Sequence, residues 1–162
     1  MDKAFLQWFF DRVEPYREVP PDKLTAEREA AERVEEHNRN YSDFLTNAVF
    51  PNTEKLVQFL TGHRIVHRVT TWGNQLSIRV HMAWRWGELV ITQSHEDAMS
   101  FEHHIITEGE KRSDDHAEDT VHQYDLHDPV PPIIAQQELA FFLSRLVQDL
   151  VEDEEPDVPL GE

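Results

Sequence analysis

The sequence predicts an α+β fold: N-terminal helices, then a five-stranded antiparallel meander, then a long C-terminal helix packed on the sheet. Three patterns support this prediction. Apolar residues recur at helical spacing toward both ends of the chain, they alternate with polar residues in the middle, and glycine or proline separates the segments. We expect residues 1–151 to form a single domain, because a chain of 162 residues can bury one core. Residues 152–162 are acidic and are expected to be a disordered tail.

The strongest strand signal runs from Leu76 to Trp86, where apolar residues occupy every second position. This period of two predicts one buried and one solvent-facing side, with both tryptophans of the segment on the buried one. Turns are predicted on either side of it, at Gly73-Asn74 and at residues 86–87. The five predicted strands are 65–72, 75–85, 88–94, 100–107 and 120–126.

The N-terminal part of the chain predicts helices. Residues 2–14 form the first, ended by Pro15, and its aromatic-rich side is expected to cover the protein's own core, with another chain as the alternative. Residues 24–37 predict a charged outer helix capped by Asp22 or Thr25, and a break is expected at residues 38–40.

A more apolar helical stretch follows from Tyr41. We expect Pro51 to kink or restart it and Gly62 to end it in a left-handed conformation. Residues 133–151 carry the longest apolar stripe of the chain, so this last helix is expected to lie across the sheet.

The charge and the composition limit the class of partner. The chain has 32 acidic and 15 basic side chains, a formal net charge of −17. Such a field repels nucleic acid and anionic membranes, and it favours a basic or amphipathic protein partner; a homodimer is a further expectation. The sequence has no cysteine, no apolar run long enough to span a membrane and no secretion leader, so a cytoplasmic protein is expected.

The solvent-facing side of the sheet supplies the candidate site. The turn at Gly73-Asn74 places Arg68 opposite Arg79, and two facing arginines favour an anion between them. The predicted turn at residues 86–87 adds polar residues from the next two strands. The predicted site for a carboxylate or phosphate group comprises Arg68, Arg79, His81, Thr92, Glu102 and His104.

Within this site, His81 and Glu102 are the candidates for proton transfer. The alternative is the ordinary polar face of an antiparallel sheet, with both arginines paired to acids. On the apolar side, His67 and His103 fall on nonadjacent strands with no evident third ligand, so we expect core histidines, and neither a metal nor another cofactor. Phosphate-binding loops, nucleophile elbows and zinc-protease motifs are absent from the sequence.

Three classes of function remain. We expect first a non-catalytic acidic binding or adaptor protein that engages a protein partner. One alternative is a small-ligand-binding protein or enzyme that uses the polar sheet face or a cavity between the sheet and the last helix. The other is an acidic mimic of nucleic acid that binds a basic protein.

Overall fold

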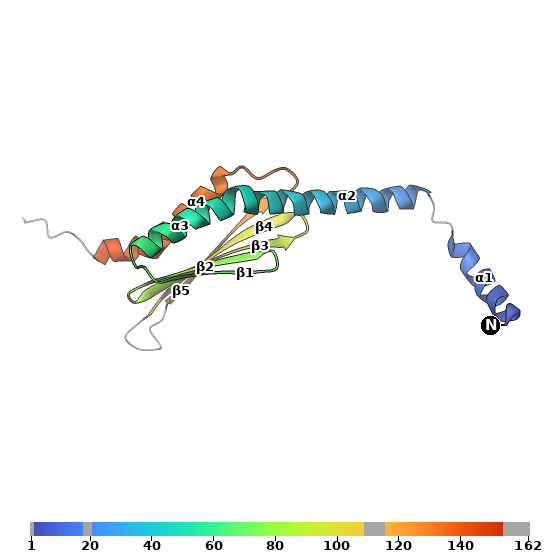
Figure 1. Cartoon of the computed structure of the whole chain (residues 1–162), viewed down its shortest axis with the longest axis horizontal. Helices are drawn as coiled ribbons and strands as arrows, with labels where there is room; N and C mark the ends of the chain where they lie inside the picture. The colour runs from blue at the N-terminus through green and yellow to red at the C-terminus, as the bar shows by residue number, and fades with distance from the viewer. Residues whose placement is uncertain (1, 18–20, 109–115, 154–162) are drawn as a thin grey trace, which may run out of the picture. The chain divides into compact units, whose positions relative to one another are not determined.

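The computed structural model describes residues 2–17, 21–108 and 116–153, and it confirms the α+β fold. The chain divides into two compact units, residues 1–36 and 37–162. The second unit contains the whole sheet (Figure 1). The single domain expected over residues 1–151 stays a prediction, and residues 154–162 of the expected tail lie outside the described part of the chain.

Helix α1 (Lys3–Arg17) belongs to the first unit. It does not end at Pro15 as predicted, because a proline in the last turn removes only one helical hydrogen bond. None of the side chains described between residues 2 and 36 is buried. The expectation that α1 covers the protein's own core stays a prediction.

Helix α2 (Pro21–Phe44) is longer than predicted. It begins at its proline rather than behind the expected caps, because the fixed φ of proline suits the first helical position. The expected break at residues 38–40 is also wrong: Asn40 is buried and donates from Nδ2 to the carbonyl oxygen of Leu126 at 2.7 Å. Tertiary contacts therefore override the weak helix propensity of these residues.

The predicted restart at Pro51 is confirmed. A π-helical turn, η1 (Leu45–Val49), precedes helix α3 (Phe50–Gly62), and the proline lies in the first turn of α3. Proline has no N–H for the carbonyl four residues back, and the wider π-helical turn accommodates its ring. Asn52 adds a side-chain hydrogen bond from Nδ2 to the carbonyl oxygen of Ala48 at 2.6 Å.

Helix α3 ends at Gly62 as predicted, but the left-handed residue is Arg64, with φ of 58°, and not the glycine. The N–H of Ile65 donates to the carbonyl of Leu60 at 2.9 Å, and the N–H of Arg64 donates to that of Thr61 at 3.2 Å. This pair of bonds closes a helix through one left-handed residue, a position that usually holds glycine. An arginine there carries backbone strain.

The five strands form one antiparallel sheet in the order β1-β2-β3-β4-β5, which confirms the predicted meander (Figure 1). Their bounds are β1 (His67–Trp72), β2 (Gln75–Met82), β3 (Arg85–His95), β4 (Ala98–Thr107) and β5 (His116–Asp125).

The turn between β2 and β3 lies at Ala83-Trp84, not at residues 86–87 as predicted. Ala83 there adopts a positive φ of 31°. Because the turn comes earlier, the side chains of Arg85 and Trp86 point to the opposite sides of the sheet from those predicted. Arg85 is buried, and Trp86, expected in the core, faces the polar side of the sheet opposite His81.

Gly87 lies inside β3 because helix α4 (Ile133–Asp153) comes very close to the sheet at this point. A Cβ at position 87 would lie 2.9 Å from a ring carbon of Phe142 and 3.0 Å from the δ-methyl of Ile105, and both of these side chains are buried. Packing, rather than a turn, therefore requires the glycine.

The core of the second unit lies between the sheet and its helices. Helix α4 packs against β3 and β4, and Figure 1 shows α3 and α4 on the same face of the sheet. Among the described helices, none combines the length and the apolar character needed to cross a membrane. The sheet contributes Leu76, Ile78, Val80, Leu89, Ile91, Met99 and Phe101 to the core, and the helices contribute Tyr41, Phe44, Leu139, Phe142 and Leu146.

Candidate functional site

On the polar face of the sheet, the predicted pairing of the two arginines is confirmed. Arg68 lies directly opposite Arg79, as predicted. Arg79, however, donates from Nε and NH2 to one carboxylate oxygen of Glu88 at 3.1 and 2.8 Å. Its guanidinium also stacks over the ring of Trp86 at 4.5 Å. This arginine is therefore already paired with an acid and an aromatic ring.

The two proposed proton-transfer residues are not brought together. Because the turn comes early, His81 pairs with Trp86 rather than lying beside Thr92. Glu102 pairs with Val90, two strands away from His81 and four residues further along the sheet. At the rise of a strand, four residues correspond to about 13 Å. Direct proton transfer between these two side chains is excluded in this arrangement.

The remaining predicted residues have other partners. Thr92 pairs with Ser100 across β3 and β4. His104 contacts Asp119 from Nδ1 at 2.7 Å and Glu102 from Nε2 at 3.5 Å. Burial lowers the pKa of His104, but the hydrogen bonds and charges of Asp119 and Glu102 together outweigh it, so the pKa is raised. The six residues therefore lie on one face, but they do not converge on one point.

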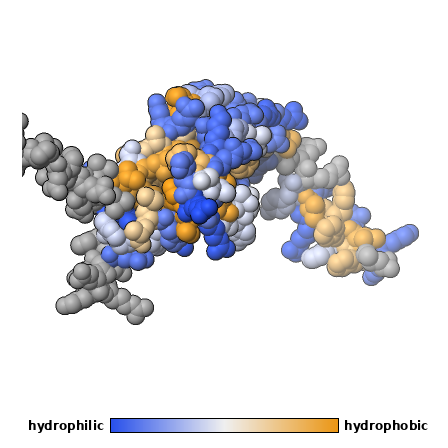
Figure 2. All heavy atoms as spheres, turned by 60° about the vertical axis from the view of Figure 1, so that its left-hand side comes forward, coloured by the Kyte–Doolittle hydropathy of each residue, from blue (hydrophilic) through white to orange (hydrophobic). Residues whose placement is uncertain are grey.

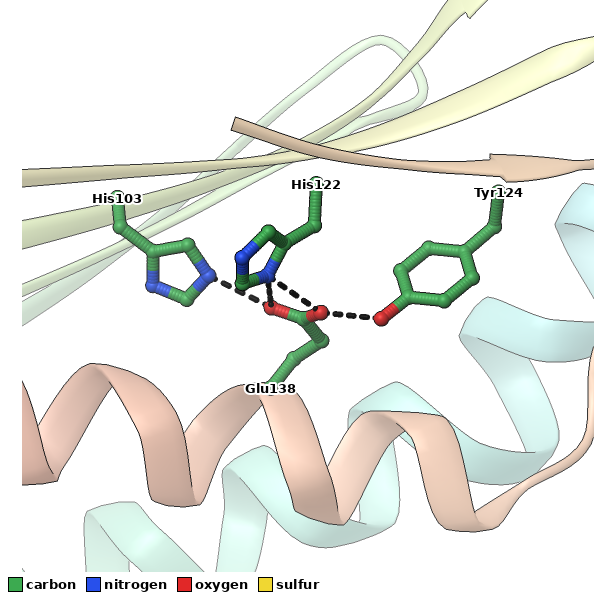
Figure 3. Close-up of polar contacts among 4 residues, drawn as sticks. All are labelled: His103, His122, Tyr124 and Glu138. Atoms are coloured by element: carbon green, nitrogen blue, oxygen red, sulfur yellow. Dashed lines mark hydrogen bonds and ion pairs between the residues drawn. The ribbon is translucent and has the colours of Figure 1, made fainter. Parts of the chain in front are cut away.

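A different cluster converges on the opposite, helix-covered face (Figure 3). It consists of Glu138 from α4, His103 from β4, and His122 and Tyr124 from β5. The pairing of β4 with β5 makes the two histidines diagonal neighbours, and their ring centroids are 5.3 Å apart. The α4 carboxylate reaches between them because α4 packs across this part of the sheet.

The carboxylate of Glu138 accepts hydrogen bonds from all three side chains. Nε2 of His103 donates at 2.6 Å, and Nδ1 of His122 donates at 2.8 Å to one carboxylate oxygen and 3.0 Å to the other. The hydroxyl of Tyr124 donates to Oε1, the oxygen that also accepts the shorter bond from His122. Since a carboxylate only accepts, each histidine nitrogen that faces it carries the hydrogen.

The cluster is buried at one end and reaches the surface at the other. The side chains of Glu138 and His103 are 3% and 1% exposed, whereas that of His122 is 35% exposed. An open depression beside β5 is lined by His122, Tyr124, Glu138 and Phe141 among others. The ring centroid of Phe141 lies 4.9 Å from that of His103 and 4.8 Å from that of His122.

The electrostatics of the cluster favour an ionised Glu138. Burial raises its pKa, but hydrogen bonds from His103, Tyr124 and His122 and the charge of His122 outweigh burial, so the pKa is lowered. Burial and the adjacent carboxylate raise the pKa of Tyr124 well above its usual range, so the phenol keeps its proton. The cluster thus holds an anionic oxygen among neutral or cationic donors.

Hydrogen bonding within the chain does not satisfy every atom of the cluster. Nδ1 of His103 is buried and has no hydrogen-bond partner among the described residues. Unpartnered polar atoms in such buried side chains are uncommon, and this one is not the ring nitrogen that faces Glu138.

One part of the prediction for the histidines on the apolar side is confirmed. His67 and His103 do lie on nonadjacent strands, and His67 bonds to Thr61 and the carbonyl of Ile65 instead. The residues that lie beside His103 are instead His122 and Glu138, and Glu138 sits in the apolar stripe of α4 next to Leu139. A charged residue inside an apolar stripe is the sequence signal that could have pointed to this site.

A second hollow lies between the ends of α3, β2 and α4. It measures about 320 Å³. Ser144 is the one polar side chain in its described lining, so the hollow lacks the convergent polar groups that orient small ligands. The lining residues are Leu56, Phe59, Leu60, Ile65, Val80, Met82, Leu143, Ser144, Leu146 and Val147.

Comparison with known proteins adds no family to this α+β class: no family model, curated protein or solved structure matches the chain significantly. The function is therefore inferred from the residues themselves.

Proposed function

We propose that the protein binds a divalent transition-metal ion of the zinc class through His103, His122 and Glu138. One observation carries the proposal: these three residues come from three different elements, and one ligand atom of each lies within 4.8 Å of the others. Two imidazoles and one carboxylate are a ligand set that suits zinc and its neighbours, and it is a poor set for magnesium or calcium.

To accept such an ion, ligand atoms that lie up to 4.8 Å apart would have to approach one another by up to about 1.5 Å. Ligand bonds of about 2.0–2.1 Å in a tetrahedral arrangement place the ligand atoms roughly 3.3 Å apart. The atoms that now share hydrogen bonds, Nε2 of His103 and a carboxylate oxygen of Glu138, are 2.6 Å apart and would separate by less than about 1 Å. The ion would take the place of the hydrogens between the histidines and the carboxylate.

The surroundings support three protein ligands and one open position. The depression that reaches His122 and Glu138 gives solvent or a small ligand access to a fourth coordination site. Tyr124 donates its hydroxyl hydrogen to the carboxylate of Glu138 and so fixes its orientation. A hydrogen-bonded carboxylate is the usual support of a metal site.

Zinc titration of the full chain tests the proposal. We expect one ion per chain at about pH 7.5 and much weaker binding at about pH 5.5, because protonated imidazole does not ligate. The variant His122→Gln changes the most exposed of the three ligands, and it is expected to lower the affinity at least about tenfold. Cobalt(II) added in place of zinc gives an absorption signal that reports nitrogen and oxygen coordination.

The matched control is His104→Gln, since His104 lies on the polar face of the sheet, outside the proposed site, and the change removes one of the eight histidines other than His103 and His122. This control is expected to keep the wild-type affinity. Zinc should also raise the thermal midpoint of the wild type and of the control, but not that of His122→Gln. Equal affinities of His122→Gln and the wild type would overturn the proposal.

A further inference from the structure

Strand β1 forms an edge of the sheet that the proposed metal site does not explain. In the described part of the chain β1 pairs with β2 alone, and its residues after His67 are all exposed. Figure 2 shows hydrophobic side chains at the surface of the unit that contains the sheet. Trp72, at the end of β1, is 82% exposed, and Val66, just before its start, is 67% exposed. An exposed edge of this kind is a surface on which a further strand can pair.

The backbone of β1 has an inward and an outward set of hydrogen-bonding groups. Successive residues of a strand direct their N–H and C=O groups to opposite sides. The carbonyl of Val66 accepts from the N–H of His81 at 2.9 Å, so residues 66, 68, 70 and 72 face β2. His67, Val69 and Thr71 therefore direct their backbone groups away from the sheet, where no described strand pairs with them.

The two edges of the sheet differ in their charge. Charged side chains along an edge strand discourage pairing with another chain. Strand β5, at the other edge, carries Glu118, Asp119 and Asp125, whereas β1 contains no acid. Residues 55–87 include no aspartate or glutamate at all, although the chain carries −17. Of the two edges, β1 is therefore the one at which two copies of the chain can meet without acid facing acid.

From this pattern we propose that β1 pairs in antiparallel orientation with β1 of a second copy of the chain. A two-fold axis at Val69 places this residue against Val69 of the other copy, and it places His67 against Thr71 of the other copy. In each of these pairs the two residues exchange both of their N–H···O bonds. Every outward-facing residue of β1 then has a partner within β1, which an axis at either neighbouring residue does not achieve.

The side chains suit the same register. On the polar face of the sheet the axis places Val66 against Trp72 of the other copy, so two strongly exposed hydrophobic side chains cover each other. Arg68 lies opposite Thr70 of the other copy, and Trp72 of the other copy is its diagonal neighbour, within reach of a cation–π contact. No arginine of one copy therefore lies directly opposite an arginine of the other.

Disulfide trapping tests the register, because the chain contains no cysteine. In Val69→Cys the new thiols of two copies meet at the axis, with Cα atoms about 5.5 Å apart, which a disulfide can span. Thr71→Cys is the matched control: residue 71 is exposed on the same side of β1, but its two copies lie about 13 Å apart along the strands. Oxidation is expected to link Val69→Cys at least about tenfold faster. Equal linking rates of the two variants would overturn the proposal.

Sedimentation of variants without cysteine tests the backbone pairing. Proline at position 69 removes an outward N–H and suits an edge strand, so Val69→Pro is expected to fold and to be monomeric where the wild type is dimeric. Val69→Ala removes the same side chain but keeps the N–H, and it is expected to dimerise at least about tenfold more tightly than Val69→Pro. The thermal midpoint of each variant checks its folding.

Two results of the sedimentation experiment contradict the proposal. One is a folded Val69→Pro variant that dimerises as tightly as the wild type. The other is a wild type that stays monomeric up to about 100 μM, as when β1 pairs with a strand of another protein.

Discussion

The carboxylate of Glu138 on α4 lies 2.6 Å from Nε2 of His103 on β4, and both side chains are almost fully buried. This contact places a charged group inside the apolar interface between the last helix and the sheet. An unpaired charge there would be strongly unfavourable, so the position of α4 depends on its donors as well as on its apolar packing.

Replacement of Glu138 by glutamine is therefore expected to lower the free energy of unfolding by about 2–4 kcal/mol. The amide nitrogen of Gln would face an N–H or O–H donor, and buried donors would lose their acceptor. Denaturant unfolding at neutral pH measures the loss. The control is Glu118→Gln, which removes an acid that is 57% exposed and paired with Arg145. A surface pair of this kind contributes at most about 1 kcal/mol, and equal losses in both variants would contradict the assigned role.

The same carboxylate predicts a pH dependence. The pKa of Glu138 in the folded state is lowered from its ordinary value of 4.5. Its contribution to stability is therefore present above that value and is lost as the pH falls through the lowered folded value. We expect the stability difference between the wild type and Glu138→Gln to shrink between about pH 5 and pH 3. Unfolding curves of both proteins across this range measure it, and a difference that grows on acidification would contradict the lowered pKa.

The parts of the fold that the sequence predicted are those that local patterns determine. From Leu76 to Met82 the alternation of apolar and polar residues matches alternating burial, because one side of a single strand faces the core. The early turn at residues 83–84 was missed because Gly87 suggested a turn, whereas Phe142, far along the chain, is the residue that requires this glycine.

The cluster around Glu138 could not be predicted from the sequence, because it also depends on contacts between distant segments. His103 and His122 become neighbours only through the pairing of β4 with β5, and Glu138 joins them only once α4 is placed on the sheet. The pairing of the arginines on the polar face could be predicted from the sequence, since the turn at Gly73-Asn74 alone places Arg68 opposite Arg79. Its residues share a face by alternation, but alternation does not bring them to one point.

The close approach of α4 to β3 predicts that Gly87→Ala lowers the free energy of unfolding by about 1–3 kcal/mol. The added methyl would lie within 3.1 Å of two ring carbons of Phe142, and this ring is fully buried and cannot move freely. Denaturant unfolding measures the loss. Gly62→Ala is the control, because a Cβ there meets no atom within 4 Å, and it should be neutral or stabilising. A second change, Phe142→Leu, should reduce the additional cost of Gly87→Ala in a double-mutant cycle.

Arg64 predicts a stabilising substitution. It holds a positive φ of 58° at the end of α3, where a side chain strains the backbone and glycine does not. Arg64→Gly is expected to raise the free energy of unfolding by up to about 1 kcal/mol relative to Arg64→Ala. Both variants remove the same positive charge, so the comparison isolates the backbone conformation from the electrostatics of this acidic chain. Thermal and denaturant unfolding of the two variants measure the difference. If the alanine variant is as stable as the glycine variant, the left-handed conformation of residue 64 carries no strain, and the helix end is held by its hydrogen bonds from Ile65 and residue 64 alone.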